Sequence, residues 1–110
     1  MEKNNEIMII KSNFFEKSSM IEYVDLPVMS KLRTIRKSAF AECSNLIVNT
    51  LPDSIEMIES QAFYKTSGIT IKKLPTSLAE LGTNAFQMCS GLTELDINNT
   101  QLTAISDYAF

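Results

Sequence analysis

The chain of 110 residues carries 10 Lys and Arg against 13 Asp and Glu, a formal net charge of −3, and no histidine. Its length is typical of one domain. The acidic balance and the short, interrupted groups of Lys and Arg argue against nucleic-acid binding, which requires a basic surface. Because no run approaches the roughly 18 to 20 apolar residues of a membrane-spanning helix, no membrane span is expected.

The first elements in chain order are a polar leader and one coil of a repeat. Residues 1–6 lack the basic flank and the long apolar core of a secretory signal. An apolar segment, 7–15, forms the return half of the coil. A short turn leads from it to the strand 21–26, in which side chains alternate between the two faces.

The rest of the chain repeats this coil. The repeat is clearest in Ala-Phe pairs that recur every 23, 23 and 24 residues, with Phe14-Phe15 as a fifth copy. The pairs are Ala39-Phe40, Ala62-Phe63, Ala85-Phe86 and Ala109-Phe110. In every copy, aliphatic side chains stand five and eight residues before the phenylalanine that ends the pair. A period of about 20 to 29 residues with this spacing is typical of a leucine-rich repeat, in which each coil contributes one strand to a parallel sheet.

We therefore predict a single domain, 1–110, that folds as a short right-handed leucine-rich repeat solenoid of the α/β repeat class. Its parts are the leader 1–6, the coils 7–26, 27–51, 52–74 and 75–97, and a partial coil 98–110. The strands of one small parallel sheet are expected at 21–26, 46–51, 69–74 and 92–97. The Ala-Phe segments are expected to form short helical or 3-10 turns on the return side, with their phenylalanines in the core.

The segment from Leu74 to Leu92 also carries a family pattern. It reads Leu-Pro-x-Ser-Leu-x-x-Leu-Gly-x-x-Ala-Phe-x-x-Cys-Ser-x-Leu. This pattern resembles the BspA-type leucine-rich repeat, and the resemblance extends over almost the whole chain. It implies a bacterial or protist surface protein with a role in adhesion or host contact. The cysteine of the pattern is replaced by Ser18 and Thr66 in two of the coils.

No catalytic or metal-binding constellation is visible, so we predict that the chain is not an enzyme and uses no cofactor or metal. Histidine, the usual general base, is absent. Cys43 and Cys89 occupy the same position two coils apart, and strand spacing separates them by about 10 Å, beyond the reach of a disulfide. They are expected to be buried thiols. Two cysteines without histidine cannot complete a tetrahedral zinc site.

Glu94 and Asp96 are two residues apart on a predicted strand, so both carboxylates point the same way. Such a pair could bind calcium or transfer protons. We favour a solvated strand face, because the neighbouring strand carries Ile71 and Lys73 rather than a second pair of acids. Lys73 beside Asp96 predicts a cross-strand ion pair.

The outward side chains of the predicted sheet are the candidate partner-binding residues. They form two columns: Tyr23, Val48, Ile71 and Glu94, and Asp25, Thr50, Lys73 and Asp96. The apolar members of the first column predict an exposed stripe, a feature that commonly marks an interaction site. Flanking chain or neighbouring subunits that cover the stripe are the alternative. Lys72 stands where Val24 and Leu95 indicate burial, so the third coil is expected to be locally irregular.

We predict a non-enzymatic protein-interaction or adhesion module that binds a protein or glycan partner through the sheet face. The alternative is a structural subunit of a virion or surface array, which self-associates through an open C-terminal coil. Its basis is the absence of a polar cap, which normally closes a solenoid. A cell-surface or extracellular location is expected for a fragment of a longer protein, and a cytoplasmic or virion location otherwise.

Overall fold

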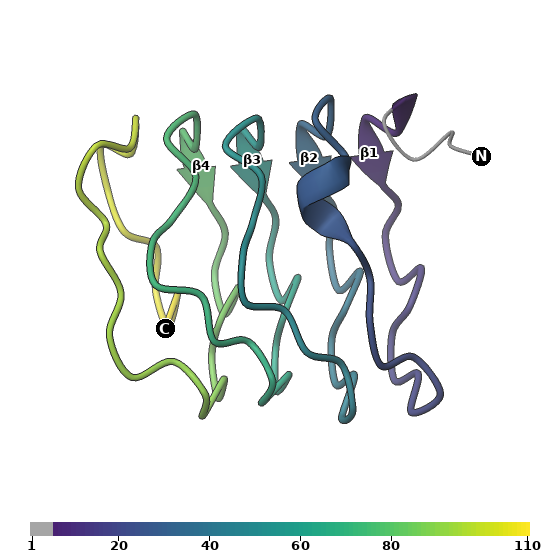
Figure 1. Cartoon of the computed structure of the whole chain (residues 1–110). Helices are drawn as coiled ribbons and strands as arrows, with labels where there is room; N and C mark the ends of the chain where they lie inside the picture. The colour runs from purple at the N-terminus through teal and green to yellow at the C-terminus, as the bar shows by residue number, and fades with distance from the viewer. Residues whose placement is uncertain (1–5) are drawn as a thin grey trace.

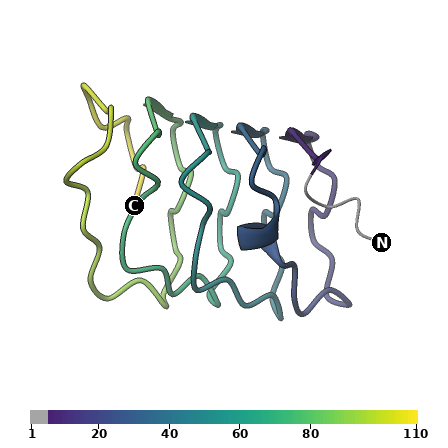
Figure 2. The same ribbon diagram turned by 45° about the horizontal axis from the view of Figure 1, so that its top comes forward.

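The computed structural model describes residues 6–110, so the predicted leader lies outside the described residues except for Glu6. The chain winds into a stack of flattened coils that runs from the purple to the yellow end (Figures 1 and 2). One four-stranded parallel sheet lines one side, in the order β1-β2-β3-β4. The strands are β1 (Ile9–Ile10), β2 (Thr34–Ile35), β3 (Met57–Ile58) and β4 (Glu80–Leu81). The structure is therefore the predicted short leucine-rich repeat solenoid.

The sheet lies on the other half of the coil from the one predicted. The segments 21–26, 46–51, 69–74 and 92–97 are joined only by the isolated parallel bridges Tyr23↔Ile47, Val48↔Ile69 and Lys73↔Asp96. The partners of these bridges are 24, 21 and 23 residues apart, so the register changes from coil to coil and no continuous ladder forms. In the sheet, by contrast, one residue of each strand points inward and pairs with its equivalent in the next coil. These residues are Ile10, Ile35, Ile58 and Leu81. We call the bridged side of the solenoid the bridge face.

The Ala-Phe segments are turns, but not the helical or 3-10 turns that the sequence suggested. The residue before each Ala-Phe pair, and before Phe14-Phe15, has a left-handed backbone. In the first four copies, so does the residue two positions after the pair. In the second coil these are Ser38 (φ 57°) and Glu42 (φ 56°). The 3-10 helix η2 (Leu26–Val28) lies at a Leu-Pro bend instead, where Pro27 presets φ.

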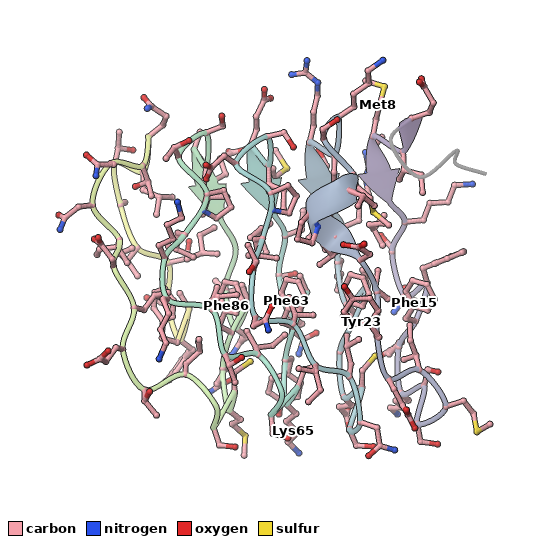
Figure 3. All side chains as sticks on the ribbon, viewed as in Figure 1. Met8, Phe15, Tyr23, Phe63, Lys65 and Phe86 are labelled. Carbon is pink, nitrogen blue, oxygen red and sulfur yellow. The ribbon has the colours of Figure 1, made fainter. Side chains whose placement is uncertain are left out.

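The core is a stack of phenylalanine rings, one from each coil (Figure 3). Phe15, Phe40, Phe63 and Phe86 follow one another with ring centroids 5.2 Å apart and interplanar angles of 16° or less. Phe110 continues the stack at 5.8 Å. Parallel rings at this separation stack with an offset, which stabilises aromatic pairs beyond the burial of their area. Aliphatic side chains from both halves of each coil surround the rings.

Phe63→Ala should unfold the chain or lower its free energy of unfolding by about 3 to 5 kcal/mol, because it removes a fully buried ring from the middle of the stack. Thermal melting followed by circular dichroism measures this. Phe14→Ala is the matched control, since that ring is 63% exposed. A melting curve of Phe63→Ala that overlays that of the unsubstituted chain would show that the stack is not the core.

Glu42→Gly should raise the free energy of unfolding by about 0.5 to 1 kcal/mol, because glycine adopts the left-handed backbone of this position without steric cost. Glu22→Gly is the control, since Glu22 is exposed and its φ is not positive. That substitution should cost about 0.5 to 1 kcal/mol in backbone entropy. Urea titrations compare the two. Equal destabilisation by both glycines would contradict the left-handed turn.

Candidate functional site

The eight sequence-predicted site residues lie on the bridge face, but they do not form the expected stripe. Val48 and Ile71 are only 4% and 1% exposed and belong to the core, so their predicted exposure is wrong. Five of the others are exposed and Asp25 is half-buried. The exposed residues are Tyr23, Thr50, Lys73, Glu94 and Asp96.

The physical reason is that the inward-pointing residue shifts by one position between coils. In the first and fourth coils, Val24 and Leu95 are the residues that pack against the core. In the second coil Val48 takes the inward place, and the polar Asn49 and Lys72 stand exposed at the positions equivalent to Val24. A change of one residue moves a strand's side chains to the opposite face. The polarity of Asn49 and Lys72 was the signal in the sequence that could have shown this.

In the first two coils, a pair of side chains forms an exposed apolar surface on this face. Tyr23 is 70% exposed and Ile47 is 52% exposed, and a parallel bridge places their backbones side by side. We call this pair the Tyr23–Ile47 patch. Sequence reasoning missed Ile47, because its inward neighbour Val48 was assigned to the surface. The hollow beside the patch has a volume of about 40 Å³, so the patch is a nearly flat surface.

The charges on the bridge face are arranged differently from the prediction. The backbones of Lys73 and Asp96 are paired, but the ammonium of Lys73 lies 4.0 Å from the carboxylate of Asp53. The carboxylate of Asp96 accepts a hydrogen bond from the backbone N–H of Asn98 at 2.8 Å. All three charged side chains are exposed, so their interactions contribute little stability and remain available to a partner.

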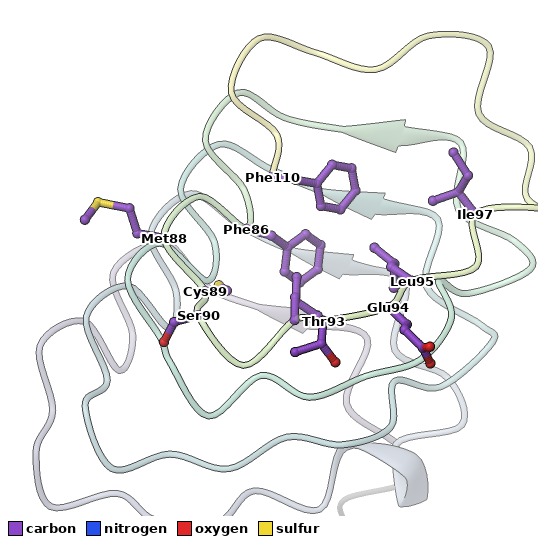
Figure 4. Close-up of a pocket in the computed structure, with 10 residues that line it drawn as sticks. Phe86, Met88, Cys89, Ser90, Thr93, Glu94, Leu95, Ile97 and Phe110 are labelled. Atoms are coloured by element: carbon purple, nitrogen blue, oxygen red, sulfur yellow. The ribbon is translucent and has the colours of Figure 1, made fainter.

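The more apolar of the two large hollows lies at the C-terminal end of the stack (Figure 4). We call it the end groove. It has a volume of about 410 Å³ and is lined by Phe86, Met88, Cys89, Ser90, Leu92, Thr93, Glu94, Leu95, Ile97 and Phe110. A second hollow of about 570 Å³ lies over β3, β4 and residues 103–106, lined mostly by small and polar side chains.

Neither hollow contains a recognisable catalytic arrangement. Among residues 6–110 there is no group of three side chains suited to holding a metal ion. The same residues include no helix that is long and apolar enough to span a membrane. What the site offers chemically is contact: flat apolar area, exposed charges and an apolar groove.

The two cysteines have a structural role. Cys43 and Cys89 are free and buried, as expected. The thiol of Cys43 donates a hydrogen bond to the carbonyl of Phe15 in the preceding coil at 2.9 Å. Cys89 donates in the same way to Phe63 at 3.0 Å, and the hydroxyl of Thr66 donates to Phe40 at 2.6 Å. Thr66 replaces cysteine in this column because its hydroxyl provides the same donor.

Burial raises the pKa of the Cys89 thiol from 9.0 to about 11, and burial also raises the pKa of Cys43. A raised pKa in the folded state means that the folded chain holds a proton that the unfolded chain releases. Its contribution to stability is fully present below pH 9 and is lost as the pH rises toward 11. A thiol with such a pKa is also a poor nucleophile at neutral pH.

Cys89→Thr should therefore reduce the fall in melting temperature between pH 9 and pH 11, because threonine keeps the hydrogen-bond donor and removes the ionisable thiol. The measurement is a series of melting curves across this pH range, with the melting temperature at pH 7 as the reference. Some decline should remain, since Cys43 still titrates. An unchanged slope would show that Cys89 does not contribute to the alkaline destabilisation.

Known proteins share the repeat and the fold described above. A family model described as "BspA type Leucine rich repeat region" matches residues 6–110 in six copies. Among solved structures, a leucine-rich repeat protein of T. pallidum superposes with a TM-score of 0.57 at 20% sequence identity. That match covers 91% of this chain and 66% of the other, and it shows likeness of fold. No curated protein sequence matches this chain.

Proposed function

Since the chain belongs to the BspA-type leucine-rich repeat family, we propose that it is a non-enzymatic interaction module that binds a partner through its bridge face. The observation that carries this proposal is the Tyr23–Ile47 patch, an exposed aromatic and aliphatic pair on a rigid scaffold. A buried Phe stack and intercoil hydrogen bonds support the backbone on which both residues stand.

The composition of the patch favours a protein partner over a glycan. Tyrosine supplies a large contact area with few rotatable bonds, and it is enriched among the residues that dominate protein interfaces. Ile47 adds an aliphatic surface without hydrogen-bonding groups, which fits an apolar side chain better than a sugar hydroxyl. Asp25, Thr50 and Lys73 provide polar groups on the same face, and interfaces combine an apolar centre with polar residues.

The setting that fits this module best is the cell surface, in adhesion or contact with a host. The support is the family, whose BspA-type repeats are often found in surface proteins. Adhesion requires a surface that binds without chemistry, and the described residues offer binding area rather than reactive groups.

The double variant Tyr23→Ser and Ile47→Ser should lose more than about tenfold in affinity, as expected for removal of an aromatic anchor from an interface. The probes are ligands selected on the unsubstituted chain from a library of displayed peptides and from a glycan array. Phe14→Ser is the matched control, because Phe14 is similarly exposed at 63% but lies outside the bridge face. Both variants should melt close to the unsubstituted chain, as surface substitutions do. Selected ligands that bind both variants equally would show that the patch is not the binding surface, and ligands from the glycan array alone would contradict the choice of a protein partner.

A further inference from the structure

Three cationic side chains stand together on the outer face of the sheet, where β1 and β2 lie side by side (Figure 1). Lys11 directly follows β1, and Arg36 and Lys37 directly follow β2. Ile10 and Ile35 pair and point inward, so Lys11 and Arg36 point outward from neighbouring strands. Lys37 lines the hollow over β3 and β4 together with the outward residues of those strands. We call these three residues the basic cluster.

The exposure of the basic cluster is a property of the sheet face and does not depend on the ends of the chain. The second coil has a neighbouring coil on each side, and Arg36 and Lys37 are nevertheless exposed. Successive coils add strands at the edge of the sheet, so a neighbouring coil leaves the outward side chains open. Lys11 has the same place in the first coil and is also exposed.

The positive charge of the cluster is not neutralised within the described part of the chain. On β2 and the residue before it, the pattern is different, because Arg33 lies 2.6 Å from the carboxylate of Glu56. Among residues 6–110, no carboxylate forms an ion pair with the basic cluster. Lys11 and Arg36 lie beside each other on neighbouring strands, and like charges in this arrangement repel. A bound anion would relieve that repulsion.

Acidic residues limit the positive region on its far side. Glu59 follows β3 at the position equivalent to Arg36, and its carboxylate accepts a hydrogen bond from the backbone N–H of Lys37 at 3.1 Å. Glu80 is exposed on β4. The outer face therefore changes from positive at the first two strands to negative at the next two. A long polyanion laid along the stack would be repelled by these acids, so the face favours a short run of negative charge.

An apolar side chain borders the cluster on the other side. Ile9 precedes Lys11 by two residues on the same strand, so both side chains lie on the same face, and Ile9 is 47% exposed. A sulfated sugar has no aliphatic side chain to bury against Ile9, whereas an acidic peptide can carry one beside its carboxylates. Carboxylates also match the planar guanidinium of Arg36, which binds them through two parallel hydrogen bonds.

We propose that the basic cluster binds a short acidic segment of a partner protein. Neighbouring carboxylates of the segment contact Lys11 and Arg36, and an adjacent aliphatic side chain packs on Ile9. The contacts lie at the surface, so salt screens them and the affinity is modest. This site is separate from the Tyr23–Ile47 patch, which lies on the other half of the coil.

The test is fluorescence anisotropy of a labelled peptide of consecutive glutamates followed by leucine, with the 110-residue chain at low ionic strength. Saturable binding is expected. The double variant Lys11→Gln and Arg36→Gln should weaken it about five- to twentyfold, because it removes two ion pairs. Lys65→Gln with Lys72→Gln is the matched control, since it removes the same charge from exposed positions outside the sheet face and should leave the affinity within about twofold.

A second peptide tests whether the carboxylates are recognised. Replacement of its glutamates by glutamines keeps the length and the leucine and should abolish binding. Both double variants should melt close to the unsubstituted chain, as surface substitutions do. Equal weakening by the two double variants, full affinity for the glutamine peptide, or no binding of the acidic peptide would overturn the proposal.

A sulfated oligosaccharide distinguishes a glycan as the occupant. It should bind more weakly than the acidic peptide, because Glu59 and Glu80 repel its further sulfates. A chain that binds the oligosaccharide through Lys11 and Arg36 but does not bind the peptide would overturn the choice of a protein partner.

The variant Tyr23→Ser with Ile47→Ser should bind the acidic peptide normally, because both residues lie on the bridge face. Loss of peptide binding in that variant would overturn the assignment of the peptide to the basic cluster. Failure of the bridge-face function is a separate result, since it concerns other ligands and leaves binding of the acidic peptide unchanged.

Discussion

The stack of phenylalanine rings is the interaction on which the other features of this solenoid depend. Each ring contributes to the core of its own coil and contacts the ring of the next at a centroid distance of 5.2 to 5.8 Å. Both backbone groups of a ring residue can bond to the next coil. The N–H of Phe40 donates to the carbonyl of Ala62 at 2.8 Å, and the carbonyl of Phe40 accepts from the hydroxyl of Thr66. Packing and hydrogen bonding therefore hold the coils at one separation.

This arrangement requires backbone that most residues avoid. Each Ala-Phe turn places a non-glycine residue in the left-handed region so that alternate N–H groups reach the next coil. Asn13 and Asn84 suit this conformation, whereas Ser38 and Gln61 adopt it at a cost that intercoil bonding offsets. The sheet half and the turns are regular, whereas the pairing register between neighbouring coils varies on the bridge face. That variation exposes Ile47 while Val48 stays buried, and it creates the patch proposed to bind a partner.

The proposed binding surface depends on the rigidity of the repeat. The Tyr23–Ile47 patch is a nearly flat surface of side chains on a rigid backbone, suited to a folded partner. It acts by contact rather than by reaction. The nucleophiles that the chain does contain, Cys43 and Cys89, are buried hydrogen-bond donors with raised pKa values.

The sequence by itself determined the repeat, the phenylalanine core and the buried thiols, because these follow from side chains that recur at a constant spacing. It did not determine which half of the coil forms the sheet, since aliphatic residues recur at regular spacing in both halves and only a constant register between coils completes a ladder. The tertiary structure also decided that Val48 faces inward and that Lys73 lies beside Asp53 rather than the side chain of Asp96. These outcomes depend on one-residue differences in the pairing between coils, which reverse the direction of a side chain without changing the hydrophobic period.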